Sequence, residues 1–231
     1  MSAIKAVLFD LDNTLYSELD YVGSGFEAVA GYLSSRYALQ KDDITKRLFD
    51  MLAAKGRGRV FDELLRELDL YDADKVKLLL WIYRSHRPQL HLYDGALQVL
   101  GDLKRSGMNI GIITDGMASV QRNKIEALGL NDVFETVICT DELGREFWKP
   151  STVPFKIALD LLRVRGDEAA YVGDDLSKDF IGPNALGMLT VMVKSDVMLN
   201  PVGDSPPKNA MPKFSVDRLE EVLSLGRGTS P

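Results

Sequence analysis

The chain has 231 residues, of which 45% are hydrophobic and 27% charged, a composition typical of a globular protein that can bury a sizeable core. Its formal net charge of −6 and sequence pI near 5.1, without any basic run, argue against a protein that binds nucleic acid or anionic membranes. The single cysteine, Cys139, excludes an internal disulfide and, together with the lack of an amino-terminal apolar leader, predicts a cytoplasmic protein.

The first predicted element is a buried strand that ends at two carboxylates. Apolar residues from Ala6 to Phe9 run directly into Asp10-Leu-Asp12-Asn-Thr14, a D-x-D-x-T motif. Side chains at alternate positions of an extended chain share a face, so both carboxylates can reach one substrate atom or one cation. Asp, Asn and Thr are also ordinary turn residues, so the motif alone does not decide the function.

A long stretch from Leu15 to about Leu92 follows, and its apolar residues recur at helical spacing without a convincing strand. This spacing predicts four amphipathic helices, with Asp42 or Asp43 as the cap of the second. The apolar stripes are Val22, Phe26, Val29, Leu33 and Tyr37; Ile44, Leu48, Met51 and Leu52; Phe61, Leu64, Leu65 and Leu68; and Val76, Leu79, Leu80 and Tyr83. Four such helices can pack as a small bundle, which predicts a separate helical cap domain over residues 16–92.

From Asp94 onward helices and strands alternate, which is typical of a doubly wound α/β sheet. The predicted helices are Ala96–Arg105, Val120–Leu128 and Phe155–Val164, closed by Gly107, Gly129 and Gly166, and a terminal helix is predicted over Val216–Leu225. The predicted strands after the first are Asn109–Thr114, Glu135–Thr140, Ala169–Gly173 and Met188–Val193. A surface loop over 200–212 and a frayed tail from Gly226 complete a core domain made of residues 1–15 and 93–231.

Polar residues follow three further predicted strands. Thr114 offers a hydroxyl that can donate to a phosphoryl oxygen, and Gly116 lets backbone N–H groups approach an anion closely. Lys149, next to Pro150, is a compact cation that can neutralise carboxylate and phosphate together. The predicted strand Ala169–Gly173 runs into the clustered acids Asp174, Asp175 and Asp179. Clustered carboxylates repel one another unless a cation or protons offset them, so this cluster predicts a hard-cation site.

Taken in chain order, the D-x-D-x-T, Thr, Lys-Pro and Gly-Asp-Asp-x-x-x-Asp motifs resemble those of the haloacid dehalogenase superfamily of phosphohydrolases over nearly the whole chain. The resemblance implies a Rossmann-like parallel sheet core with an inserted α-helical cap domain. It also implies that Asp10 attacks phosphorus and that Asp12 is the general acid and base, a role that requires a raised pKa. Thr114 and Lys149 would stabilise the charge of the phosphoryl group.

The resemblance further implies Mg²⁺ as the cofactor. In this family pattern the metal would be held by Asp10, the backbone carbonyl of Asp12 and Asp174, with Asp175 and Asp179 as outer acids, of which one contacts the metal directly or through water. The implied phosphate-binding residues are Thr114, Asp115, Gly116 and Lys149. Asp115 departs from the asparagine that many members carry at this position.

A helical cap between the first two motifs is the arrangement this family uses for small substrates. It implies a phosphatase acting on a small phosphate monoester, such as a sugar phosphate, a nucleoside monophosphate or a phospho-acid. Within the cap, the loop Lys55-Gly-Arg57-Gly-Arg59 offers Arg57 or Arg59 as substrate-specificity residues, and the alternative is a solvated basic loop.

Two alternative functions stay open at this point: a phosphomutase of the same superfamily, which keeps both aspartates, and a catalytically inactive binding module. A dehalogenase is disfavoured, because such enzymes need no metal and lack an acid at the position of Asp12. The predicted partner is a small phosphorylated metabolite, with no nucleic acid and no membrane, and either a monomer or a homodimer fits the sequence.

Overall fold

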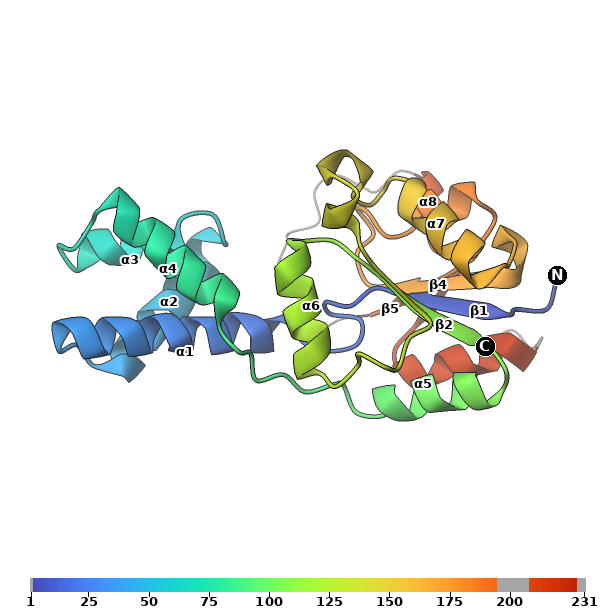
Figure 1. Ribbon diagram of the computed structural model, residues 1–231, viewed down its shortest axis with the longest axis horizontal. Coiled ribbons are helices and arrows are strands. Elements are labelled where there is room, and N and C mark those ends of the chain that lie inside the picture. Colours follow the sequence, from blue (N-terminus) through green and yellow to red (C-terminus); the bar gives the residue numbers. More distant parts are fainter. Residues whose placement is uncertain (1, 195–207, 228–231) are drawn as a thin grey trace. The chain divides into compact units, whose positions relative to one another are not determined.

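The computed structural model describes residues 2–194 and 208–227, and the chain divides into two compact units. The larger unit consists of Met1–Glu18 and Leu90–Pro231, and the smaller one of Leu19–Gln89. The larger unit contains the sheet, whereas the smaller unit is built from helices (Figure 1). Among the described residues, no helix has the length and apolar character needed to cross a membrane.

A six-stranded sheet forms the centre of the larger unit, and every neighbouring pair of strands is parallel. Its strands are β1 (Ala6–Phe9), β2 (Asn109–Thr114), β3 (Thr136–Cys139), β4 (Ala169–Gly173), β5 (Leu189–Val193) and β6 (Phe214–Val216). The order across the sheet is β3-β2-β1-β4-β5-β6. The predicted doubly wound parallel sheet is therefore confirmed, with β1 between β2 and β4.

The register of the sheet brings the motif residues to one edge. Phe9, the last residue of β1, pairs with Ile112 of β2 and with Val172 of β4, and the Asp10 backbone N–H donates to the Val172 carbonyl at 2.8 Å. The chain proceeds to one side of β1 through β2 and β3 and to the other side through β4, β5 and β6. Such a switch point, at the carboxyl ends of parallel strands, is where open α/β sheets bind ligands.

Helices cover both faces of the sheet, as Figure 1 shows: α7 and α8 lie on one face, and α5 and the terminal 3-10 helix η5 on the other. The helices of this unit are α5 (Ala96–Arg105), α6 (Ala118–Ala127), α7 (Val153–Leu162) and α8 (Ile181–Ala185). Short 3-10 helices are η1 (Thr140–Glu142), η2 (Arg145–Phe147), η3 (Gly166–Glu168), η4 (Lys208–Ala210) and η5 (Leu219–Arg227). Buried Leu8, Tyr171 and Phe155 join β1, β4 and α7 in one hydrophobic core.

The smaller unit is a bundle of four helices, as the apolar spacing predicts. These are α1 (Glu18–Tyr37), whose first residue still belongs to the larger unit, α2 (Lys41–Lys55), α3 (Val60–Glu67) and α4 (Ala73–Ser85). One core holds buried residues of all four, among them Val29, Leu48, Leu64 and Leu79. Below, the smaller unit is called the helical insert.

The insert leaves and rejoins the larger unit at two hydrogen-bonded points of the chain. The Tyr93 backbone N–H donates to the Leu15 carbonyl at 2.9 Å, and Tyr16 forms isolated bridges with Leu92 and with Asp12. The chain segment that leads into the insert, directly after the D-x-D-x-T motif, is therefore paired with the segment that leads out of it.

Three details of the sequence interpretation are wrong. Gln40, without a side-chain bond, is the N-cap of α2, and Asp42 and Asp43 lie in its first turn, where their charge still favours the helix dipole. Gly166 does not close α7, because the helix ends at Leu162 and Gly166 begins η3.

The third error is at the carboxyl-terminal end. Val216 is the last residue of the edge strand β6, and a 3-10 helix from Leu219 replaces the predicted terminal α-helix. A strand of three residues is too short to show an alternation of apolar and polar residues that can be told from a helical pattern. Of the predicted loop over 200–212, residues 208–210 form η4, residues 200–207 lie outside the described part of the chain, and so do residues 228–231 of the predicted tail.

Gly166 is needed for packing, and this predicts a loss of stability in Gly166→Ala. A Cβ atom there would lie 1.9 Å from the carbonyl oxygen of Leu186, which is backbone and cannot swing away. We expect Gly166→Ala to lower the free energy of unfolding by roughly 1–3 kcal/mol in urea titrations followed by circular dichroism.

The matched control is Gly101→Ala within α5, where the nearest atom is the flexible end of Arg105, 3.1 Å away. That change should stabilise the protein by about 0.5–1 kcal/mol, because alanine has the better helix propensity. Equal stability of the two variants would contradict the packing role of Gly166.

Candidate active site

A buried lysine joins the first and the last motif at the edge of the sheet. The Lys149 ammonium, with a fully buried side chain, donates to Asp10 Oδ1 at 2.6 Å and to Asp179 Oδ1 at 2.8 Å. Its third partner is the Tyr171 hydroxyl at 3.1 Å. Burial opposes the charge of Lys149, but the two carboxylates outweigh it and hold the lysine pKa well above its usual value.

Asp179 positions the turn after β4. Its Oδ2 accepts from the backbone N–H groups of Asp174 and Asp175, at 3.1 and 2.9 Å. Gly173 leaves room for this contact, since a Cβ there would lie 2.5 Å from the same oxygen. Burial would raise the pKa of Asp179, but the charges of Lys149 and Lys178 overcome it and the pKa lies below the usual value.

Asp10, Asp174 and Asp179 each offer a carboxylate oxygen to one position, since these oxygens lie within 4.8 Å of one another. Burial raises the pKa of Asp10 to about 7 in spite of Lys149, and burial with repulsion from Asp10 and Asp179 raises that of Asp174 to about 8. The ionised carboxylates repel one another, and a cation bound among them would offset this repulsion. The donor set therefore fits a hard divalent cation.

The carboxylate of Asp175 is not one of the three grouped acids, although its backbone N–H binds Asp179. Its Oδ1 accepts from the backbone N–H and the hydroxyl of Ser177, at 2.8 and 2.6 Å, so the carboxylate caps its own turn. Between the two outer acids of the motif, it is Asp179 that lies beside Asp10 and Asp174.

The carboxylate of Asp12 accepts hydrogen bonds from three donors, none of which belongs to the four sequence motifs. Lys124 Nζ donates to Oδ1 at 2.7 Å, Gln121 Nε2 donates to Oδ2 at 2.9 Å, and the Tyr16 hydroxyl also donates to Oδ1. Burial would raise the pKa of Asp12, but Lys124, helped by Tyr16 and Gln121, brings it below the usual value. The direction is opposite to the raised pKa expected of a general acid, because the three donors favour the ionised form of Asp12.

The segment after β2 is tied to the neighbouring loops. Thr114, at the end of β2 and only 1% exposed, accepts a hydrogen bond from Gln121 Nε2 at 2.5 Å. Asp115 Oδ1 accepts from the Thr140 hydroxyl at 2.7 Å and from the Lys149 backbone N–H at 3.1 Å. This carboxylate therefore helps to place Lys149, and phosphate binding by Asp115 and Gly116 stays a prediction.

Arg57 and Arg59 lie in the helical insert and are both exposed. Arg59 precedes α3, and the neighbouring Lys55 pairs with Glu63 at 2.7 Å across the loop. The insert is described as a unit by itself, so the specificity role of the two arginines stays a prediction.

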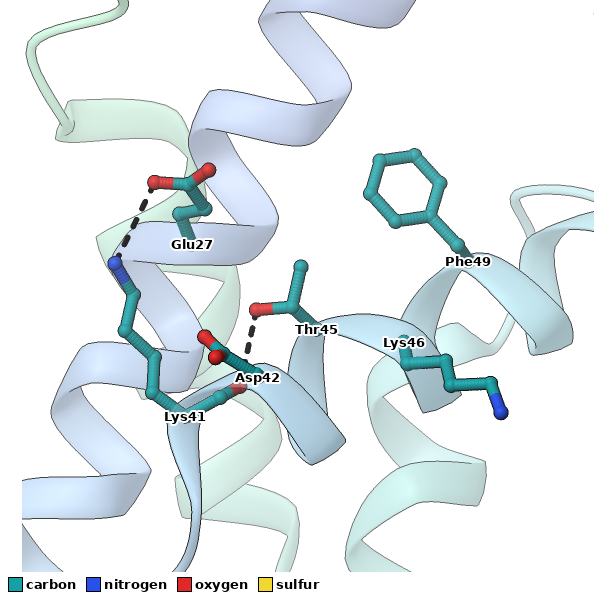
Figure 2. A pocket seen from close by; sticks show the side chains of 6 residues that line it. All are labelled: Glu27, Lys41, Asp42, Thr45, Lys46 and Phe49. Atoms are coloured by element: carbon teal, nitrogen blue, oxygen red, sulfur yellow. Dashed lines mark hydrogen bonds and ion pairs between the residues drawn. The ribbon is translucent and has the colours of Figure 1, made fainter.

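A surface depression of about 310 Å³ also lies on the helical insert (Figure 2). It is lined by Glu27 of α1 and by Lys41, Asp42, Thr45, Lys46 and Phe49 of α2. The Lys41 ammonium and the Glu27 carboxylate lie 3.4 Å apart, and the Thr45 hydroxyl donates to the Lys41 carbonyl. None of these residues belongs to the four motifs. The candidate active site is therefore the group of motif residues at the carboxyl-terminal ends of the strands.

Comparison with known proteins agrees with this geometry. The model of a family described as haloacid dehalogenase-like hydrolases matches residues 7–193, which include all four motifs. This chain belongs to the haloacid dehalogenase-like hydrolase family.

Several of the similar curated proteins are named as phosphatases. The chain is 32% identical over 195 residues to a glyceraldehyde 3-phosphate phosphatase of Methanocaldococcus jannaschii, covering 82% of this chain and 85% of that protein. It is 31% identical over 241 residues to a ribulose-1,5-bisphosphate 5-phosphatase of Halopiger xanaduensis, covering 95% and 98%. The predicted hydrolase of phosphoric monoester bonds is thereby confirmed.

Solved structures show the same fold. A haloacid dehalogenase-like phosphatase from Thermococcus onnurineus superposes with a TM-score of 0.61 at 28% identity, covering 96% of this chain and 97% of that one. An L-2-haloacid dehalogenase from Xanthobacter autotrophicus gives a TM-score of 0.63 at 20% identity, covering 98% and 100%. The second likeness concerns the fold of the family alone.

The raised pKa values of Asp10 and Asp174 predict that cation binding depends on pH. A divalent cation needs both carboxylates ionised, so its binding displaces protons when the pH lies below about 7 for Asp10 and about 8 for Asp174. We expect the affinity for Mg²⁺ to rise by about tenfold per pH unit for each proton released, between pH 6 and 8. Calorimetric titration in two buffers of different ionisation enthalpy measures both the affinity and the protons.

The matched control is Asp132→Asn, which removes an exposed acid outside the site and should bind Mg²⁺ as the parent does. Asp174→Asn should bind the cation weakly at every pH. An affinity that stays constant from pH 6 to 8 in the parent would contradict this picture of the cluster.

Proposed function

We propose that this protein is a Mg²⁺-dependent phosphatase that hydrolyses a small phosphate monoester through an aspartyl-phosphate intermediate. The observation that carries the proposal is the position of Asp10, which contacts Lys149 at 2.6 Å and shares the acid cluster with Asp174. An anionic phosphate would otherwise repel the Asp10 carboxylate. The Lys149 ammonium and a divalent cation bound by the acid cluster would offset this repulsion, so that the two groups can approach each other.

The first step is attack by Asp10 on phosphorus. A carboxylate oxygen of Asp10 forms the new P–O bond while the bond from phosphorus to the leaving oxygen breaks. Lys149 orients the nucleophile, and the Thr114 hydroxyl can donate to a phosphoryl oxygen because its own oxygen already accepts from Gln121. Mg²⁺, held by Asp10, Asp174 and the backbone carbonyl of Asp12, would supply positive charge that neutralises the phosphate.

The second aspartate moves the proton. Protonated Asp12 gives its proton to the departing alkoxide and, once ionised, takes a proton from the water that attacks the aspartyl phosphate. That attack releases inorganic phosphate and restores the Asp10 carboxylate. The contact with Lys124 lowers the pKa of Asp12, which supports its role as the proton acceptor in the second of these steps.

The substrate we propose is a short sugar phosphate. Five of the similar curated proteins are named glyceraldehyde 3-phosphate phosphatases, and another is a ribulose-1,5-bisphosphate 5-phosphatase. A phosphate-release screen of the purified protein with Mg²⁺ tests this proposal against nucleoside monophosphates and phospho-acids. It also separates a phosphatase from a phosphomutase, because only the phosphatase releases inorganic phosphate from one substrate.

Replacement of the nucleophile is the direct test of the mechanism. Asp10→Asn is nearly isosteric but cannot form the acyl phosphate, so we expect turnover to fall by more than about 10⁴-fold with the fold retained. The measurement is phosphate release by protein whose circular dichroism matches the parent. Asp132→Asn again serves as the control, and substantial residual turnover in Asp10→Asn would refute the covalent route.

We further infer that the helical insert sets substrate choice and that its basic loop contributes. Arg57→Ala and Arg59→Ala should raise KM for the best sugar phosphate and hardly change hydrolysis of p-nitrophenyl phosphate, because a contact to the remote part of a substrate is absent from a small aryl ester. Steady-state kinetics on both substrates measure the difference. Lys46→Ala, an equally cationic site on α2 outside the loop, is the control. Parent-like kinetics of both arginine variants would leave the loop as a solvated connector.

A further inference from the structure

The buried face of helix α6 carries two polar side chains at the candidate active site. Gln121 is 1% exposed and Lys124 is 3% exposed, and they stand one helical turn apart beside the apolar residues Val120 and Ile125. Burying an ammonium group and an amide is unfavourable unless both find good partners. Their partners therefore show what this face of the helix does.

Both side chains meet at the carboxylate of Asp12. Lys124 Nζ lies 2.7 Å from Oδ1 and Gln121 Nε2 lies 2.9 Å from Oδ2, so α6 holds each oxygen of the carboxylate by a separate bond. The Tyr16 hydroxyl adds a bond to Oδ1. Hydrogen bonds at both oxygens prevent the carboxylate from rotating, so it keeps a single orientation.

Gln121 also connects Asp12 to Thr114. The same Nε2 that donates to Asp12 donates to the Thr114 hydroxyl oxygen at 2.5 Å. Because an ionised carboxylate only accepts hydrogen bonds, the contact with Asp12 requires the amide nitrogen of Gln121, and not its oxygen, to face the site. Gly116 leaves room for this side chain, because a Cβ there would come within 3.3 Å of Gln121 Oε1.

We propose that Lys124 and Gln121 are positioning residues that act through Asp12, fixing the orientation of its carboxylate for the proton transfers to the leaving group and from water. This inference rests on the proposed function, since it requires Asp12 to be the acid and base. Lys124 and Tyr16 hold Oδ1, while Gln121 holds Oδ2 and binds the Thr114 hydroxyl with the same amide nitrogen.

A purely structural role is the competing explanation. The Lys124–Asp12 ion pair joins α6 to the loop after β1, so its loss could simply loosen the fold. The two explanations differ in what kinetics would show. A positioning role affects the step in which Asp12 moves a proton, whereas a loosened fold affects every substrate and every step.

The experiment compares two substrates that differ in the need for acid catalysis. p-Nitrophenyl phosphate has a good leaving group, while glycerol 3-phosphate releases a poor alkoxide that needs the proton of Asp12. In Lys124→Met we expect kcat for glycerol 3-phosphate to fall by about 10- to 100-fold more than kcat for the aryl ester, with KM values close to those of the parent. Gln121→Leu should show the same split, and Lys124→Arg should recover part of the loss.

Arg122→Met is the matched control, because it removes a cation from the same helix. Arg122 pairs with Glu142 at 2.8 Å, away from Asp12, and its side chain is 54% exposed. This variant should behave as the parent does on both substrates. Melting curves of all variants show whether each is folded at the assay temperature.

A double-mutant cycle gives the decisive readout. If Lys124 acts only through Asp12, then Asp12→Asn combined with Lys124→Met should turn over as Asp12→Asn alone does. The double variant removes both charges of the pair, so it should remain folded even where Lys124→Met alone does not. Equal losses in both backgrounds, or equal losses on both substrates, would overturn the proposal.

Failure of the proposed function would look different. A parent protein that hydrolyses neither ester, or an Asp12→Asn variant as active as the parent, would remove the proposed role of Asp12 itself. An active parent and an impaired Asp12→Asn, with Lys124→Met indistinguishable from Arg122→Met, would overturn only the positioning role of α6.

Discussion

The site depends on the ion pairs that the buried Lys149 ammonium forms with Asp10 and Asp179. Taking such a group out of water is costly, and the cost is offset here by two carboxylates and a phenol hydroxyl within 3.1 Å. The same contacts fix Asp10 in place and hold Asp179 where it can bind the backbone N–H groups of the turn that carries Asp174. Asp10 and the acid cluster that it shares with Asp174 and Asp179 are thus placed by one positive charge.

The two aspartates of the first motif have opposite electrostatic surroundings, although a single residue separates them. Asp10 belongs to a cluster with an excess of carboxylates, and its pKa rises to about 7, chiefly through burial. The Asp12 side chain is 18% exposed against 3% for Asp10, and although burial still raises its pKa, Lys124 and two neutral donors bring that pKa below the usual value. The partners come from different parts of the chain, since Lys149 follows β3 while Lys124 belongs to α6. Environments that separate neighbouring carboxyl groups in this way allow them different chemical roles.

Much of the site could be predicted from sequence, for a reason that lies in the sheet. Asp10 and Asp174 directly follow strands, Thr114 is the last residue of β2, and Lys149 lies in the segment after β3. Parallel strands have their carboxyl-terminal ends on the same side of the sheet, so local sequence patterns and this one topological rule are enough to bring the four residues together. The family resemblance supplied the roles. Helices of the insert were predictable as well, because each shows a clear apolar stripe.

The remaining features depend on contacts between distant segments. Gln121 and Lys124 look like ordinary exposed residues of α6, and only packing against the first motif shows that both are buried. The carboxylate of Asp115 binds Thr140 and the Lys149 backbone, neither of which is near it in the chain. In the sequence Gly166 looks like a helix stop, but glycine is needed there because a Cβ atom would collide with the carbonyl oxygen of Leu186.

The hydrogen bond between Leu15 and Tyr93 has a consequence for how this protein can change over evolution. Because the ends of the helical insert are joined there, the sheet is continuous without the insert, and the entropy of closing the intervening chain grows only with the logarithm of its length. An insert of a different size could occupy the same junction with little change in the stability of the sheet. Tyr16 lies in that junction and also binds Asp12, so such an exchange would leave one contact of the Asp12 carboxylate in place.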